Sequence, residues 1–261
     1  MSLHAPRILT DILSLDLHRR RARAARRSDA FFLHARACEE IRARIGEIGG
    51  KPSRAALVSG FPEYWNKEIK IAESYPDREF LDLPRSKFDL LIHAMSLHWS
   101  NDPVGQLIQC RLALGQNGKF LCVLLGGATL RELRHSLTEA EILTTGGASP
   151  RVAPMGDIRD LGDLLQRAGF ADAVADSLTV KATYSTALAL MQDLRFMGET
   201  NALDQRIKAF APRMLFLECA RIYGECFARP DGRIPATFEL IFLTARAPDS
   251  AAPDEIVSGK A

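Results

Sequence analysis

Short apolar runs that alternate with helix-like segments constrain the fold of this chain more than any other feature. The clearest runs are residues 55–58, 88–94 and 119–125, which have the length of buried strands and are too short for helices. A helix-like segment separates the last two, with Asp102 as its cap and Pro103 in its first turn. Strands that alternate with helices are typical of βαβ units around a largely parallel sheet, so the pattern predicts an α/β fold.

The flanking segments extend this pattern in both directions. Before the first strand, residues 8–48 are helix-like and end at two glycines and a proline. Residues 69–72 and 79–83 are weaker strand candidates. Further helices are predicted at 129–143, 157–168, 185–197 and 212–227, and further strands at 174–182 and 236–245.

The predicted organisation has one main domain. Of the 261 residues, 47% are hydrophobic, which is enough for one sizeable core. We expect an Arg-rich helical segment over residues 1–50, the main domain over 51–248 and a flexible tail over 249–261.

Charge and cysteine content limit the partners and the compartment. The formal net charge is only +2, so no nucleic-acid partner is predicted, and no stretch has the length of a membrane span. Five scattered cysteines without a C-x-x-C pair favour a reducing, cytoplasmic location and no metal site. Six arginines between residues 19 and 27 form either a solvated helix face or a contact for an acidic partner. Arg-rich starts also occur in organelle transit peptides, so the mitochondrial matrix is the alternative location.

Ligands of open α/β sheets bind beyond the carboxyl ends of the strands, so the residues after each apolar run are the candidate site. Ser59 and Gly60 follow the first run and form a candidate cofactor turn, although Phe61 and Pro62 also suit a simple strand-to-helix turn. Glu73 follows the run at 69–72 and is placed to accept the two hydroxyls of a ribose, with an ordinary surface role as the alternative.

A cluster of polar and aromatic side chains follows the run at 88–94. It contains Ser96, Leu97, His98, Trp99 and Asn101, a composition that suits a pocket wall with a few convergent polar groups. His98 is the candidate catalytic base, and Trp99 is placed to pack on a ring or a sulfonium. Loop packing is the alternative interpretation.

Paired glycines follow the run at 119–125. Gly126 and Gly127 permit close approach of a ligand, and Thr129 is the predicted cap of the next helix. Arg134 lies about one turn further, where it could meet an anionic substrate or form a salt bridge.

These segments, with others downstream, give the chain a family resemblance. It resembles class I S-adenosylmethionine-dependent methyltransferases, in particular the methyltransferase-like assembly factors of respiratory complex I and, more distantly, the malonyl-acyl-carrier methyltransferase of biotin synthesis. The matching stretches are Ser96-Leu97-His98-Trp99, Gly126-Gly127 with Thr129-Leu130, Ser149-Pro150-Arg151-Val152-Ala153-Pro154, Asp160-Leu161-Gly162, Met197-Gly198-Glu199 with Asn201, and Asp231-Gly232 through Thr237.

The resemblance implies a Rossmann-like, seven-stranded methyltransferase sheet with flanking helices and a helical lead segment. It implies S-adenosylmethionine as the cofactor. The candidate residues to hold it are Ser59, Gly60, Glu73, Ser96, Leu97 and Trp99. The candidate substrate pocket comprises Asn101, Gly126, Gly127, Thr129 and Arg134. The resemblance also implies an association with complex I assembly, in which one family member hydroxylates an arginine. The substrate would then be a small molecule or a protein, and a respiratory complex subunit is a possible partner.

The chain departs from the family pattern in the cofactor half. Only one glycine follows the first strand, and residues 55–88 are short by about one helix and one strand. Ala128 stands where the family has an acidic residue. This truncated or degenerate half leaves two hypotheses open: S-adenosylmethionine-dependent methyl transfer, or a non-catalytic pseudo-methyltransferase that acts as an assembly or binding factor. Arginine hydroxylation is a third hypothesis, although no His/His/carboxylate set has the spacing of metal ligands.

Overall fold

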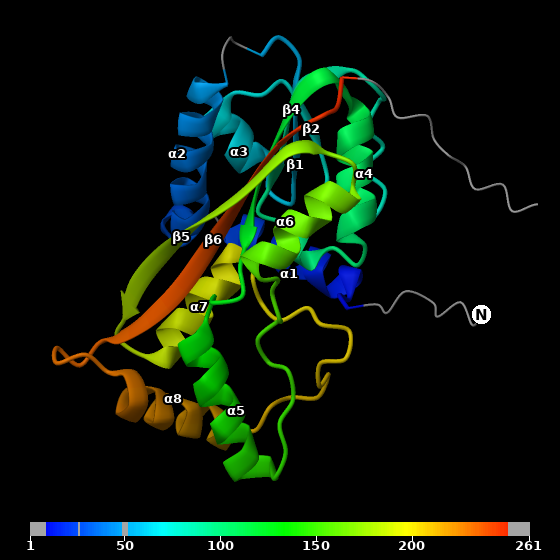
Figure 1. Cartoon of the computed structure of the whole chain (residues 1–261). Helices are drawn as coiled ribbons and strands as arrows, with labels where there is room; N and C mark the ends of the chain where they lie inside the picture. Colours follow the sequence, from blue (N-terminus) through cyan, green and yellow to red (C-terminus); the bar gives the residue numbers. More distant parts are fainter. Residues whose placement is uncertain (1–8, 26, 49–51, 250–261) are drawn as a thin grey trace, which may run out of the picture.

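A single six-stranded sheet organises the molecule (Figure 1). The computed structural model describes residues 9–25, 27–48 and 52–249. The strand order is β2-β1-β3-β4-β6-β5, with β1 to β4 parallel to one another and β6 antiparallel to both of its neighbours. The strands are β1 Ala55–Ser59, β2 Glu73–Tyr75, β3 Phe88–Ala94, β4 Leu114–Leu125, β5 Ala171–Tyr184 and β6 Ile234–Arg246.

This topology confirms the predicted α/β, Rossmann-like class and corrects one detail. The described residues contain six strands of the sheet, whereas the resemblance implied seven. The sheet is mixed but largely parallel, as predicted, because β1 to β5 run in one direction and only β6 runs against its neighbours. In the sheet β2 lies on one side of β1, and β3, the next strand along the chain, lies on the other side. The carboxyl ends of β1 and β3 therefore flank a topological switch point.

Helices cover both faces of the sheet (Figure 1). Helices α2, α3, α5, α7 and α8, with Ala22 of α1, contribute to one apolar cluster, and α4 and α6 contribute to the other. Leu57 of β1 belongs to the first cluster and its neighbours Ala56 and Val58 to the second, so both faces of the strand are buried. The helices are α1 Ile12–Ala25, α2 Phe32–Glu47, α3 Pro62–Ile69, α4 Pro103–Ala113, α5 Arg131–Thr145, α6 Ile158–Arg167, α7 Ala187–Met197 and α8 Arg213–Phe227, with short 3₁₀ turns η1 Ser28–Phe31 and η2 Leu97–Trp99.

Three of the local predictions are confirmed by their hydrogen bonds or bounds. The Asp102 carboxylate accepts a hydrogen bond from the Gly105 N–H at 2.8 Å and caps α4. The helix predicted at residues 157–168 is α6, and the Asp157 side chain caps it by accepting a hydrogen bond from the Arg159 N–H. The segment at 8–48 is helical in its described part, but it divides into α1, η1 and α2. Of the predicted tail at 249–261, all but Asp249 lies outside the described residues.

The two weak strand predictions are wrong. Residues 69–72 hold the end of α3 and a turn, and β2 begins only at Glu73. Residues 79–83 form no strand, because side chains of α4 take their backbone hydrogen bonds. Gln109 donates to the Glu79 carbonyl at 3.0 Å and accepts from the Leu81 N–H at 2.9 Å.

Thr129 does not cap the following helix, which corrects another prediction. Helix α5 begins after Leu130, which has a left-handed backbone and offers no side-chain cap. The Thr129 hydroxyl instead accepts a hydrogen bond from the Glu239 N–H at 3.1 Å. This hydrogen bond links the residues after β4 to β6, so Thr129 stabilises the sheet and does not cap the helix.

Truncation of the buried core should cost far more stability than truncation of the exposed face of α1. We expect Leu121→Ala, which removes a fully buried side chain from β4, to lower the free energy of unfolding by about 2–5 kcal/mol. Leu13→Ala makes the same chemical change where the side chain is 84% exposed and should change it by less than about 0.5 kcal/mol. Urea unfolding followed by circular dichroism measures both, and equal losses would contradict this description of the core.

Candidate functional site

The carboxyl ends of β1, β2 and β3 meet beneath helix α1. The residues that follow these strands are Gly60 after β1, Asp77 after β2 and His98 after β3. Arg19 reaches them from α1, and Glu199 reaches them from the end of α7. Four ionisable side chains from distant parts of the sequence therefore lie together at the switch point.

Arg19 and Asp77 form a buried ion pair at the centre of this group. Arg19 Nη1 lies 2.5 Å from Asp77 Oδ2, and the two side chains are only 7% and 10% exposed. Burial raises the pKa of Asp77, and the nearby Arg19 guanidinium opposes that rise. A Cβ built on Gly60 would lie 2.6 Å from Arg19 Cζ, so the glycine leaves room for the guanidinium.

A second contact of α1 seals the same turn. Arg23 Nη1 donates a hydrogen bond to the Gly60 carbonyl at 2.8 Å. The ring of Phe61 is buried against Gly198, where a Cβ would lie 2.8 Å from Phe61 Cζ. Gly198 also has φ +80°, a conformation that L side chains rarely adopt, so this position needs glycine for two reasons. The turn after β1 is thus packed by protein side chains.

Glu199 joins the end of α7 to the 96–99 cluster. Its Oε2 accepts a hydrogen bond from Trp99 Nε1 at 2.8 Å and lies 3.2 Å from His98 Nε2. Burial alone would raise the pKa of Glu199, but His98, Arg19 and Trp99 together hold it below the usual range. The carboxylate is therefore ionised at neutral pH and orients both the histidine and the tryptophan.

The structure separates the predicted cofactor residues. The Ser59 hydroxyl accepts from the Phe61 N–H at 3.1 Å and donates to the Ala94 carbonyl at 3.2 Å, both within the fold. Ser96 is buried, and its hydroxyl has no hydrogen-bond partner among the described residues. Leu97 packs in the core cluster of α4 and α6.

Glu73 does not stand where the sequence placed it. It begins β2 at the opposite end of the strand and pairs with Lys87 at 2.7 Å. The acidic residue that follows the carboxyl end of β2 is Asp77, which the sequence analysis missed. The signal for it, an acid shortly after the second strand, was present, but the strand itself had been placed four residues too early.

The predicted substrate residues take three different positions. Asn101 Oδ1 accepts hydrogen bonds from the Leu9 and Thr10 N–H groups at 2.8 Å, so it holds the segment before α1. A Cβ on Gly126 would lie 2.5 Å from both Glu239 Oε2 and Ile241 Cδ1, so that glycine serves strand packing. Gly127 and Arg134 both line a cleft of about 380 Å³ beside residues 149–155.

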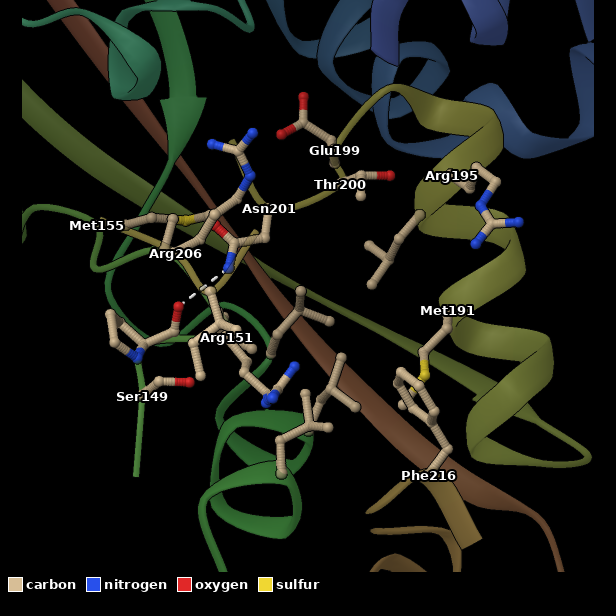
Figure 2. A pocket seen from close by; sticks show the side chains of 18 of the residues that line it. Ser149, Arg151, Met155, Met191, Arg195, Glu199, Thr200, Asn201, Arg206 and Phe216 are labelled. Carbon is tan, nitrogen blue, oxygen red and sulfur yellow. Dashed lines mark hydrogen bonds between the residues drawn. The ribbon is translucent and has the colours of Figure 1, made fainter. Parts of the chain in front are cut away.

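A cavity of about 280 Å³ lies beside Glu199 and Trp99 and shares residues 149–152 and Met155 with this cleft (Figure 2). Its walls come from α5, α7, α8 and the loops around residues 149–155 and 199–207. Three arginines line it, Arg151, Arg195 and Arg206. Two of them are neutralised within the chain, because Arg151 is paired with Glu141 at 2.6 Å and Arg206 with Asp11 at 3.0 Å. The apolar lining residues are Trp99, Leu130, Leu133, Leu137, Val152, Met155, Met191, Leu194, Ile207 and Phe216.

The residues at the switch point do not fit S-adenosylmethionine in this arrangement. A cofactor would need the glycine turn after β1 and the carboxylate after β2. Arg19 fills the space beside Gly60 and uses the Asp77 carboxylate, so both features are occupied by the chain itself.

Two further properties of the described residues bear on the site. They contain no group of three or more His, Cys, Asp or Glu side chains arranged to hold a metal ion. Across residues 9–25, 27–48 and 52–249, none of the helices is both long enough and apolar enough to cross a lipid bilayer.

Comparison with known proteins confirms the predicted resemblance. No family model matches the chain. It is 42% identical over 176 residues to "Arginine-hydroxylase NDUFAF5, mitochondrial" of Rattus norvegicus, covering 67% of this chain and 51% of that protein. It is 32% identical over 187 residues to the malonyl-[acyl-carrier protein] O-methyltransferase of Xylella fastidiosa, covering 72% and 60%. The chain spans about half the length of the first of these relatives.

Solved structures show more distant likenesses. A putative methyltransferase from Bacillus halodurans has a TM-score of 0.47 and 13% sequence identity, covering 79% of this chain and 98% of that one.

Two buried histidines beside the site should make the fold sensitive to acid. Burial lowers the pKa of His34 and of His93 from 6.5 to about 4. Between these values the unfolded chain binds protons that the folded chain does not, so stability falls as the pH falls from 6.5 towards 4. Each histidine contributes at most about 1.4 kcal/mol per pH unit over that interval.

A variant of His34 separates this effect from general acid denaturation. His34 Nδ1 accepts a hydrogen bond from Trp65 Nε1 at 3.0 Å, a bond that protonation of Nδ1 would break. His34→Gln retains an acceptor and should flatten the dependence of unfolding free energy on pH between 4.5 and 6.5 by up to about 1.4 kcal/mol per unit. His135→Gln on the exposed face of α5 is the control. An unchanged slope in His34→Gln would contradict the prediction.

Proposed function

We propose that this chain is a methyltransferase-like binding protein whose closed form, with α1 over the sheet, holds no S-adenosylmethionine. One observation carries the proposal: the Arg19 guanidinium fills the space beside Gly60 and pairs with Asp77. The turn after β1 supports it, because Gly60 is its only glycine and the space beside that glycine is taken by Arg19.

The cavity beside Glu199 and Trp99, drawn in Figure 2, is the proposed binding site. Its apolar walls favour a mainly apolar group, which would gain by leaving water. Two of its three arginines, Arg151 and Arg206, are already paired within the chain. A small molecule or a side chain of a protein partner meets these requirements.

The proposed process is assembly of a respiratory complex, with a complex I subunit as the partner. The sequence resemblance to complex I assembly factors supports it, as does the similarity to the rat protein. The relatives named NDUFAF5 are called mitochondrial, which favours the mitochondrial matrix over the cytoplasm as the proposed location.

Methyl transfer is the second candidate function. The similarity to malonyl-[acyl-carrier protein] O-methyltransferases favours it, and those relatives imply the use of S-adenosylmethionine. In that case the Glu199–His98 pair would supply a base, since Glu199 orients the imidazole. Arginine hydroxylation, the activity in the name of the rat relative, is the third candidate.

Calorimetry on the full chain tests the proposed function. S-adenosylmethionine and S-adenosylhomocysteine should each give no saturable heat at concentrations up to about 1 mM, which corresponds to binding weaker than about 4 kcal/mol. A malonyl-acyl-carrier methyltransferase measured in parallel is the positive control. Micromolar binding of either compound to the unmodified chain would overturn the proposal and favour methyl transfer.

A further inference from the structure

We propose that helix α1 is an intramolecular lid and that Arg19 is its latch. In the closed form Arg19 neutralises Asp77 and blocks the turn at Gly60. Once α1 is released, Asp77 and this turn are open to a ligand that offers hydroxyl donors, such as a nucleoside. The inference rests on the proposed function, since it gives the reason why the closed form holds no adenosyl cofactor.

Helix α1 buries little apolar surface against the domain. Its buried residues are Leu15, Arg19 and Ala22, so only two of them are apolar. Leu13 and Leu17, in contrast, are 84% and 45% exposed. Hydrophobic burial therefore contributes little to the attachment of this helix, since that contribution scales with apolar area removed from water.

Polar contacts hold α1 along its length instead. At its first turn, Asp11 pairs with Arg206 at 3.0 Å. In its middle, Arg19 pairs with Asp77, and near its end Arg23 donates to the Gly60 carbonyl. Each of these contacts replaces hydrogen bonds to water, so its net contribution to attachment is modest. Of the residues of α1, only Ala22 belongs to the two apolar clusters on the faces of the sheet, so α1 can give up these contacts with little change to the core.

The closed contact is also incompletely satisfied. Arg19 Nε is buried and has no hydrogen-bond partner among the described residues. The Arg19–Asp77 pair has also lost its hydration, and removing two charges from water costs several kcal/mol per ion before their attraction repays it. Both costs disappear when α1 lifts, which brings the closed and open forms closer in free energy.

In the open form, the Asp77 carboxylate would have the position of a ligand-binding group. Asp77 follows the carboxyl end of β2, beside the switch point between β1 and β3. A carboxylate at this place in an open α/β sheet can accept two hydroxyl hydrogen bonds, and Gly60 leaves space for close approach of the ligand. Arg19 therefore competes with such a ligand for one site.

The variant Arg19→Gln tests the lid in the full chain. Hydrogen exchange should become at least tenfold faster in the amides of α1 and remain unchanged in β3 and β4. In calorimetry, S-adenosylhomocysteine and adenosine should change from no measurable binding to saturable binding below 1 mM. Arg20→Gln is the matched control, because it makes the same substitution one residue away, where the side chain is 70% exposed and pairs only within α1.

Two results would overturn the proposal that α1 is a lid. One is unchanged exchange of α1 in Arg19→Gln, and the other is faster exchange without binding of either probe at millimolar concentration. If Arg19→Gln does not give a cooperative thermal transition, Asp11→Asn is the second variant, since it loosens the first turn of α1 and leaves Arg19 and Asp77 intact. It should give the same two changes, and their absence would equally overturn the lid.

These outcomes are distinct from failure of the proposed function. Binding of S-adenosylhomocysteine to the unmodified chain would overturn the proposed function itself. Absence of binding in both the unmodified chain and the variants would leave the binding-protein proposal standing and remove only the lid.

Discussion

Burial of the Arg19–Asp77 ion pair beneath α1 is the interaction on which the arrangement of the site depends. The pair closes the carboxyl ends of β1 and β2 and sets the position of α1 over the sheet. Burial of two charges costs free energy that their attraction only partly returns, so such a pair contributes more to the choice of one arrangement than to overall stability. The fold itself is held by the two apolar clusters on the faces of the sheet.

The residues Met197-Gly198-Glu199 show how one short stretch serves this arrangement. Met197 is buried in the core cluster that includes α7. Gly198 takes a left-handed backbone and lets Phe61 and α1 approach without a Cβ clash. Glu199 then turns back to accept from Trp99 and to lie beside His98. Three adjacent residues therefore connect the core, helix α1 and the ionisable side chains at the switch point.

Prediction from the sequence was accurate where apolar runs are long and buried on both faces. The strand at residues 88–94 was placed correctly, because strong hydrophobic patterns leave few alternatives. The run at 119–125 is the buried end of β4, which begins earlier, at Leu114, in a polar stretch that the pattern did not mark. Prediction failed at residues 69–83, where β2 has only three residues and Gln109 takes the place of a neighbouring strand. That error moved the expected acid from Asp77 to Glu73.

The sequence by itself determined the α/β alternation, the scarcity of glycine after the first strand and the cluster at residues 96–99, since these are properties of adjacent residues. Only the tertiary structure decided how the charges combine. Arg19 and Asp77 are 58 residues apart, and Trp99 and Glu199 are 100 apart. No local pattern records such pairings, because they exist only once the sheet has brought the strand ends together under α1.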